Sequence, residues 1–149
     1  MREEFTTQLR KVLDEAQAAA RSLNQEFVGT EHLTLGMIAC EPCEVARAMR
    51  LNEIDVAEFR RHLLDDLPRG GEPPVVAGNL PLSPKAKRAI NEAIVKAQVA
   101  QESRVSSRFV MLSLLEEPDT ATRQALRDIG ADVEQFQRLL AKPPADAEE

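Results

Sequence analysis

The fold is decided by residues 5–38, which read FTTQLRKVLDEAQAAARSLNQEFVGTEHLTLGMI. Residues 82–115 read LSPKAKRAINEAIVKAQVAQESRVSSRFVMLSLL and follow the same order of apolar and polar positions. A single shift lays residues 5–63 over 82–140 without a gap, and about one position in five is then identical. Conservative apolar pairs fill most of the other inward positions. Two copies with one buried pattern should fold alike and pack about a pseudo-twofold axis.

The first two helices of each copy carry clear start signals. We place the start of the first helix at Thr6 in one copy and at Ser83 in the other, since both hydroxyls can accept a backbone N–H from the first turn. Pro84 suits the first helical position because its missing N–H has no partner there in any helix. The second helix is expected to begin at Thr30 or Ser107, again as caps. It is apolar nearly all round, which predicts a central, buried helix.

The remaining two helices of each copy are shorter. The third is expected after Pro42 in one copy and Pro118 in the other. The fourth begins at Asp55 or Asp132, each followed three residues later by Glu or Gln, the pattern of a capping box. Alternating β-branched runs are missing, so no strand is predicted. The sequence therefore predicts an all-α domain of eight helices, arranged as two tandem four-helix repeats.

Proline and glycine mark the boundaries between these units. Their density in the connection between the copies excludes a helix there. We expect one domain over residues 1–141, with the first repeat at 5–66, a linker at 67–81 and the second repeat at 82–141. Residues 142–149 are proline-rich and acidic, and are predicted to be a disordered tail.

Composition restricts both the core and the partners. Apolar residues make up 43% of the 149 positions, with no Trp or Tyr and five Phe, so the core must be aliphatic. A net charge of -6 repels phosphate backbones, which argues against nucleic acid and favours a basic partner. No apolar run approaches the roughly 20 residues that span a bilayer, and the start lacks a signal peptide. We therefore expect no membrane partner and a cytoplasmic location.

A CxxC pair at Cys40 and Cys43 is the first chemical candidate. A structural zinc site needs four ligands, and the nearest further candidate, His32, lies upstream on the apolar helix. Glu117 and Thr120 stand at the matching positions of the second copy. A thioredoxin-type pair would need a βαβ setting. We interpret the pair as incidental to a helix end, and a redox or metal role is the alternative.

His32 follows Glu31 in the first turn of its helix, without the second histidine that HExxH requires. We interpret it as a structural histidine, partly buried and hydrogen-bonded near the helix start. The chain also offers no Ser-His-Asp set and no glycine-rich phosphate loop, and its carboxylates are scattered over solvated positions. These observations predict a binding module without a cofactor, and not an enzyme.

Three motifs together indicate a family. They are Phe5-Thr6 at the start, GTEHL at 29–33 with Leu35-Gly36 after it, and LSPKAKRAI at 82–90. With the repeat, they resemble the Clp N-terminal domain that precedes the ATPase rings of ClpA/ClpC-type AAA+ unfoldases, over nearly the whole chain. The resemblance implies two four-helix repeats, no catalytic activity, and recruitment of adaptor or substrate proteins to a Clp ATPase.

The resemblance also implies a ligand site. ClpC-type members can recognise phosphorylated arginine, with one site per repeat, where a carboxylate meets the guanidinium and a hydroxyl and helix N-terminus meet the phosphate. Thr6 and Glu31 match the first site. At the second, Ser83 keeps the hydroxyl but Arg108 replaces the acidic residue and would repel a guanidinium. At most one working site is expected, and Arg108 leaves open a different, acidic partner for the second copy.

No Walker motif follows the second repeat. Two possibilities stay open at this point: the chain is the N-terminal piece of a larger ATPase, or it is a small standalone regulator of a Clp machine.

Overall fold

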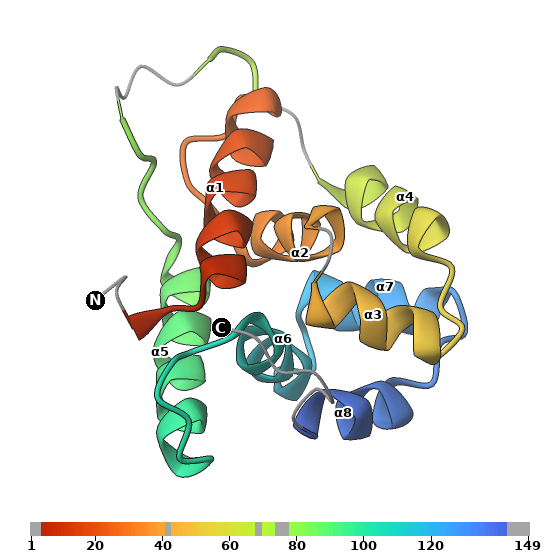
Figure 1. The fold of residues 1–149 in the computed structure, drawn as a ribbon. Coiled ribbons are helices and arrows are strands. Elements are labelled where there is room, and N and C mark those ends of the chain that lie inside the picture. The colour runs from red at the N-terminus through yellow and green to blue at the C-terminus, as the bar shows by residue number, and fades with distance from the viewer. Residues whose placement is uncertain (1–3, 41–42, 68–69, 74–77, 143–149) are drawn as a thin grey trace.

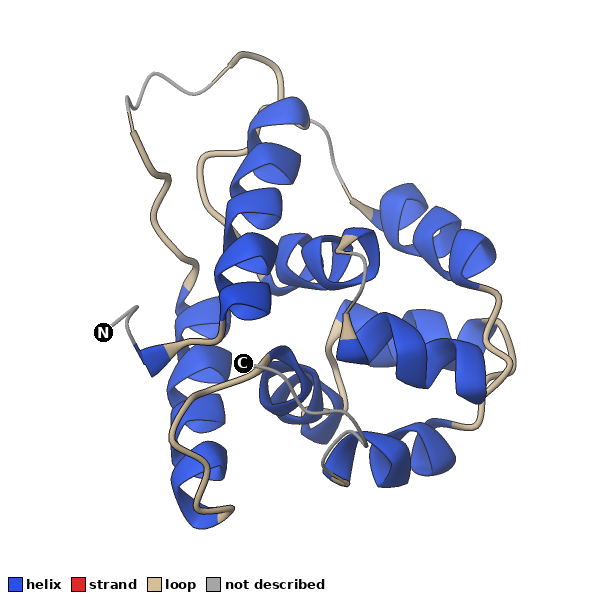
Figure 2. Cartoon of the chain, viewed as in Figure 1, coloured by secondary structure: helices blue, strands red, loops and turns tan. Residues whose placement is uncertain are grey.

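The computed structural model describes residues 4–40, 43–67, 70–73 and 78–142. Within these ranges the chain forms eight α-helices and no β-strand, which confirms the predicted all-α class (Figures 1 and 2). No helix in this described part is long and apolar enough to cross a membrane. Pro42 and nearly all of the predicted tail lie outside the described residues.

The two repeats have the same order of helices. The first contains α1 (Thr7–Ser22), α2 (Thr30–Ala39), α3 (Glu44–Leu51) and α4 (Val56–Asp66), and the second contains α5 (Pro84–Val99), α6 (Ser107–Glu116), α7 (Ala121–Asp128) and α8 (Val133–Ala141).

Four of the predicted caps hold the helix starts. The side chains of Thr6, Ser83, Asp55 and Asp132 each accept a hydrogen bond, at 3.1 Å, from the backbone N–H three residues later. Each bond satisfies one of the N–H groups that a helix start leaves without a partner. α1, α4, α5 and α8 therefore begin where the sequence places them.

The predicted caps of the two central helices were wrong by one residue. Gly29 and Ser106 occupy the cap positions, and Thr30 and Ser107 are the first helical residues. The backbone just before each cap is held extended by pairing with the other repeat, so the helix begins directly after it. Gly29 has no side chain to offer and Ser106 makes no side-chain cap bond; at the start of α6, the Oε1 of Glu44 accepts the N–H of Arg108 instead.

α2 and α6 form the centre of the domain, and both are buried on nearly all sides as predicted. α1 crosses α2 where Gly36 faces it, and a Cβ at Gly36 would lie 2.5 Å from the carbonyl oxygen of Val12. Between the repeats, α4 packs on α7 and α8 packs on α3, as a pseudo-twofold axis requires. The buried hydroxyls of Thr34 on α2 and Thr122 on α7 lie 2.6 Å apart across this interface.

The two repeats exchange their first residues. Phe5 pairs with Val105, and Leu82 pairs with Val28, as isolated parallel bridges. Thr6 accordingly donates its N–H to the carbonyl of Val105 at 3.0 Å, as Ser83 does to Val28 at 2.9 Å. Figure 1 shows the start of α1 beside the segment that leads into α6. Each first helix therefore begins next to the second helix of the other repeat.

The described residues of the linker contain no helix, as predicted. Its last part is nonetheless packed against α1. The side-chain amide of Gln17 donates to the carbonyl of Leu80 at 2.9 Å and accepts the N–H of Leu80 at 2.8 Å. The side chain of Leu80 is buried in the core. This attachment fixes the chain just before it reaches the start of α5.

Candidate functional site

A groove of about 610 Å³ lies where the start of α5 meets the start of α2. Its walls come from three places: residues 29–32 at the start of α2, residues 83–85 at the start of α5, and residues 119–121 before and at the start of α7. Phe27, which is 52% exposed, lies at its edge. The groove thus exists because the pairing of Leu82 with Val28 brings the start of α5 beside the start of α2.

Glu31 and Ser83 come together in this groove. A Cβ placed on Gly29 would lie 3.1 Å from the Oε1 of Glu31 and 3.9 Å from the Oγ of Ser83, so both oxygens border the same small space. Glycine at position 29 leaves that space open. Ser83 also caps α5, so its hydroxyl marks the positive end of that helix dipole.

Thr6 lies at the other junction. It is 7% exposed, it caps α1, and its backbone pairs with Val105. Thr6 is not among the described residues that line the groove at Glu31. The structure therefore places Glu31 beside Ser83, whereas the family resemblance implied a site made of Glu31 and Thr6. The sequence could not show this, because it does not say with which copy the residues before each first helix pair.

His32 acts as the cap of α2 that Gly29 does not provide. Its Nδ1 accepts the backbone N–H of Gly29 at 2.8 Å, so Nδ1 carries no proton in this arrangement. The side chain is 3% exposed, and its Nε2 has no hydrogen-bond partner in the described structure. Burial lowers the pKa of His32, and the carboxylate of Glu31 opposes this effect in part. The predicted hydrogen bond near the helix start is present, on a histidine more buried than expected.

An ion pair crosses the groove. The Nζ of Lys85 on α5 lies 3.8 Å from a carboxylate oxygen of Asp119, and both side chains are more than half exposed. Such an exposed pair contributes little to stability, at about 0–1 kcal/mol, so an incoming charge can replace either partner at low cost.

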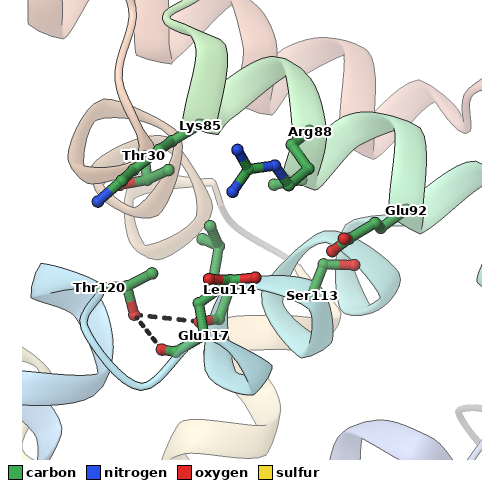
Figure 3. A pocket seen from close by; sticks show the side chains of 9 residues that line it. Thr30, Lys85, Arg88, Glu92, Ser113, Leu114, Glu117 and Thr120 are labelled. Atoms are coloured by element: carbon green, nitrogen blue, oxygen red, sulfur yellow. Dashed lines mark hydrogen bonds between the residues drawn. The ribbon is translucent and has the colours of Figure 1, made fainter.

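The groove continues into a smaller pocket, which shares Thr30, Lys85 and Thr120 with it (Figure 3). This pocket has a volume of about 10 Å³, room for about one water molecule. Figure 3 shows Arg88 and Glu92 of α5 above it, and Thr120 bonded to the carbonyls of Leu114 and Glu117 at 3.0 and 3.2 Å.

Carboxylates outnumber cations along the groove and the pocket. Glu31 and Asp119 border the groove, and the pocket adds one carboxylate from α5 and one from the residue just after α6, against the cations Lys85 and Arg88. The lowered pKa of His32 keeps it neutral near pH 7. The arrangement can accept a positively charged group at Glu31, with hydroxyl and N–H donors beside it.

Arg108 has a structural role at the second junction. Its guanidinium is 3% exposed and donates to the carbonyls of Leu140 and Ala141 at 2.9 and 3.2 Å, and to the carboxylate of Glu102 at 3.0 Å. The guanidinium carbon also lies 4.2 Å from the centre of the Phe109 ring. The side chain is directed into the domain, so its charge is not presented to an acidic partner.

The start of α6 is closed by a carboxylate from the first repeat. The Oε1 of Glu44 accepts the backbone N–H of Arg108 at 2.8 Å and the hydroxyl of Ser107 at 3.3 Å. The position equivalent to Glu44 in the second repeat is Ala121, which lines the open groove at Glu31. Sequence reasoning missed Glu44, and its only signal was this difference between the copies.

The two cysteines are buried thiols. Cys40 lies at the end of α2 and Cys43 caps α3. Burial, and next the neighbouring Cys43, raise the pKa of Cys40 to about 12. A thiol with so high a pKa is a weak nucleophile and a weak metal ligand. Within the described ranges, no three His, Cys, Asp or Glu side chains gather as a metal site would require.

Comparison with known proteins places this geometry in a family. The model of the Clp repeat (R) N-terminal domain matches residues 4–129 and, separately, residues 82–145. The chaperone protein ClpC1 of Arabidopsis thaliana chloroplasts is 31% identical over 132 residues, which is 89% of this chain and 14% of ClpC1. A ClpA homolog of Trieres chinensis is 29% identical over 140 residues, 94% of this chain and 16% of that protein. The chain therefore spans about a seventh of these relatives.

Solved structures share the fold. The N-terminal domain of Hsp104 from Candida albicans superimposes with a TM-score of 0.79 at 18% identity, covering 93% of this chain and 90% of that one. The N-terminal domain of ClpD from Arabidopsis thaliana gives 0.74 at 19% identity, covering 93% and 92%. A ClpV N-domain in complex with a VipB peptide gives 0.71 at 14% identity, covering 93% and 88%.

Proposed function

Because this chain belongs to the Clp repeat (R) N-terminal domain family, we propose that it is a non-catalytic interaction module that recruits adaptor or substrate proteins to a Clp-type ATPase. The ATPase is either part of the same protein or a separate partner. A related fold bound to a peptide, the ClpV N-domain with VipB, supports a docking role. The cytoplasmic location stays a prediction, since several relatives are described as chloroplastic.

The observation that carries the proposal is the open groove with Glu31 and Ser83 on facing walls. A guanidinium group can meet a carboxylate through two parallel hydrogen bonds. Beside it, the start of α5 offers the partial positive charge of a helix N-terminus, with Lys85 in its first turn. We infer that the ligand side chain is an arginine, and that a phosphorylated arginine adds a contact between its phosphate and the start of α5.

This assignment gives one ligand per chain. At the second junction the start of α6 already holds the carboxylate of Glu44, and Arg108 is buried. A ligand guanidinium would lack the counterpart of Glu31 there, because Arg108 stands at the equivalent position. The proposed pair is Glu31 with Ser83, and Thr6 and Arg108 have structural roles.

Calorimetry with free phosphoarginine, and with a short arginine peptide, tests the ligand. Wild type should bind with 1:1 stoichiometry, and Glu31→Gln should weaken binding by about tenfold or more, near 1.4 kcal/mol. Thr6→Ser keeps the cap and should leave the affinity unchanged. No heat from wild type, or equal affinity in Glu31→Gln, would dismiss the ligand assignment. Recruitment itself is tested by pull-down of a purified Clp ATPase with its adaptor.

A further inference from the structure

A second groove, of about 430 Å³, lies on the first repeat between α1, α2 and α4. The lining residues repeat at helical spacing on each wall, and the charges are confined to one residue on α1 and one on α4. They are Glu15, Ala18, Ala19 and Ser22 on α1 with Leu23 after it, Leu35 and Ala39 on α2, and Arg60 and Leu64 on α4. In Figure 1, α1 and α4 flank α2 at this end of the molecule.

The second repeat shows the same surface bridged by its own side chains. Lys96 and Glu116 stand at the positions equivalent to Ala19 and Ala39. The Nζ of Lys96 lies 2.9 and 2.8 Å from the two carboxylate oxygens of Glu116, so this ion pair spans α5 and α6. In the first repeat two alanine methyl groups replace the pair. At Ala19 and Ala39, α1 and α2 therefore carry no charged side chains that could bridge them, and Leu35, which is 7% exposed, forms the floor of the groove.

The charges at the rim have no internal partner. Within the described residues, Glu15 and Arg60 form no ion pair with each other or with any other side chain. The groove thus has an apolar floor, an unpaired carboxylate on one wall and an unpaired guanidinium on the other. It is complementary to a segment with an apolar face flanked by one positive and one negative side chain.

We propose that this groove binds one amphipathic helix of a partner protein, with small apolar residues facing Leu35, a cation beside Glu15 and a carboxylate beside Arg60. The small side chains of α1 and α2 allow another helix to approach closely, and residues lining a groove at three- and four-residue spacing suit a helical ligand. The lining face of α1 from Glu15 to Ser22 covers about two turns. A second copy of this chain fits less well, because two chains of net charge -6 repel.

The inference shares with the proposed function only the premise that the domain binds proteins. The residues that line this groove are not among those that line the groove at Glu31. Each groove can therefore fail or succeed without the other.

The probe is a fluorescent synthetic peptide of about four helical turns, with Ala and Leu along one face, one Arg placed for Glu15 and one Glu placed for Arg60. The matched protein variants are Ala19→Lys with Ala39→Glu, which copies the ion pair of the second repeat, and Lys96→Ala with Glu116→Ala, which removes that pair. Lysine and glutamate are good helix formers at these surface positions, so both variants should fold.

In fluorescence anisotropy, the peptide should bind wild type and Lys96→Ala/Glu116→Ala with equal affinity. Its affinity for Ala19→Lys/Ala39→Glu should be lower by about tenfold or more. Glu15→Lys should lose binding and regain it with a peptide carrying Glu in place of Arg. Glu31→Gln should bind the peptide as wild type does, and Ala19→Lys/Ala39→Glu should still bind phosphoarginine if the first groove does.

Three results would overturn the proposal: no binding to wild type, equal binding to Ala19→Lys/Ala39→Glu, or a scrambled peptide of the same composition binding as well. Sedimentation of the protein alone tests whether a second copy of this chain occupies the groove. A dimer that Ala19→Lys/Ala39→Glu abolishes would assign the groove to a second copy instead.

Discussion

Glu44 on α3 accepts the backbone N–H of Arg108 on α6 at 2.8 Å, so a side chain from the first repeat caps a helix of the second. The same oxygen also accepts the hydroxyl of Ser107. The carboxylate of Glu44 thus supplies the hydrogen-bond acceptor that the cap residue Ser106 does not. It also links the two repeats at the junction opposite the open groove.

Replacing Glu44 should therefore lower stability. Glu44→Ala leaves the N–H of Arg108 and the hydroxyl of Ser107 without their acceptor, and we expect a loss of about 1–3 kcal/mol in the free energy of unfolding. Urea denaturation measures this loss. Glu58→Ala is the control, because its carboxylate makes only an exposed pair with Arg61 at 3.6 Å. Equal effects of the two substitutions would contradict the capping role.

Arg108 should matter for folding and not for ligand binding. Arg108→Ala removes the donors of the carbonyls of Leu140 and Ala141 and leaves Glu102 unpaired, so we expect about 2–4 kcal/mol of destabilisation. Arg127→Ala, at an exposed position of α7, should change stability by less than about 0.5 kcal/mol. Thermal melts of both variants, with phosphoarginine titrations of the folded fraction, make the comparison. Loss of affinity without loss of stability would assign Arg108 to a ligand site.

Acid should weaken the domain through His32. Its pKa is lowered in the folded state by burial, so the unfolded chain binds the proton first as the pH falls. Stability is then complete above the ordinary histidine value of 6.5 and declines as the pH falls from there toward the folded pKa. Urea midpoints between about pH 8 and pH 5 should show the decline in wild type. His32→Gln should flatten it, whereas His62→Gln should retain it.

Gly36 should tolerate no side chain. A Cβ there would lie 2.5 Å from the carbonyl oxygen of Val12, a backbone atom of α1, so Gly36→Ala forces the two helices apart. We expect about 1–3 kcal/mol of destabilisation, despite the better helix propensity of alanine. At Gly71 a Cβ would meet nothing within 4 Å, so Gly71→Ala is the matched control. A stabilised Gly36→Ala protein would show that α1 and α2 do not approach this closely.

The sequence was sufficient for the helices, because hydrophobic spacing and caps are local. Asp55 and Asp132 cap the fourth helices as predicted, and the self-overlap of the chain revealed the duplication. It was insufficient for docking between the copies. A shift that lays Thr6 over Ser83 does not say with which repeat the residues before each first helix pair. They pair with the other repeat, so Ser83, and not Thr6, lies beside Glu31.

Arg108 and Glu44 were missed for a related reason. A charged residue at the start of an apolar helix reads as exposed, yet the long side chain of Arg108 carries its guanidinium to the carbonyls at the end of α8, far away in sequence. Glu44 lies in the first turn of its own helix, and only the packing of α3 against α6 shows that it caps another one. Both roles depend on tertiary contacts that no local pattern records.

The exchanged first residues bear on how such a domain can arise by gene duplication. If one repeat existed alone, the residues before its first helix would have no pairing partner within the same chain. Two identical chains could provide that partner by exchanging these residues in a domain-swapped dimer. A half-length polypeptide, residues 82–142, should then form an arm-swapped homodimer, and a folded monomer of that fragment in analytical ultracentrifugation would rule out this ancestral state.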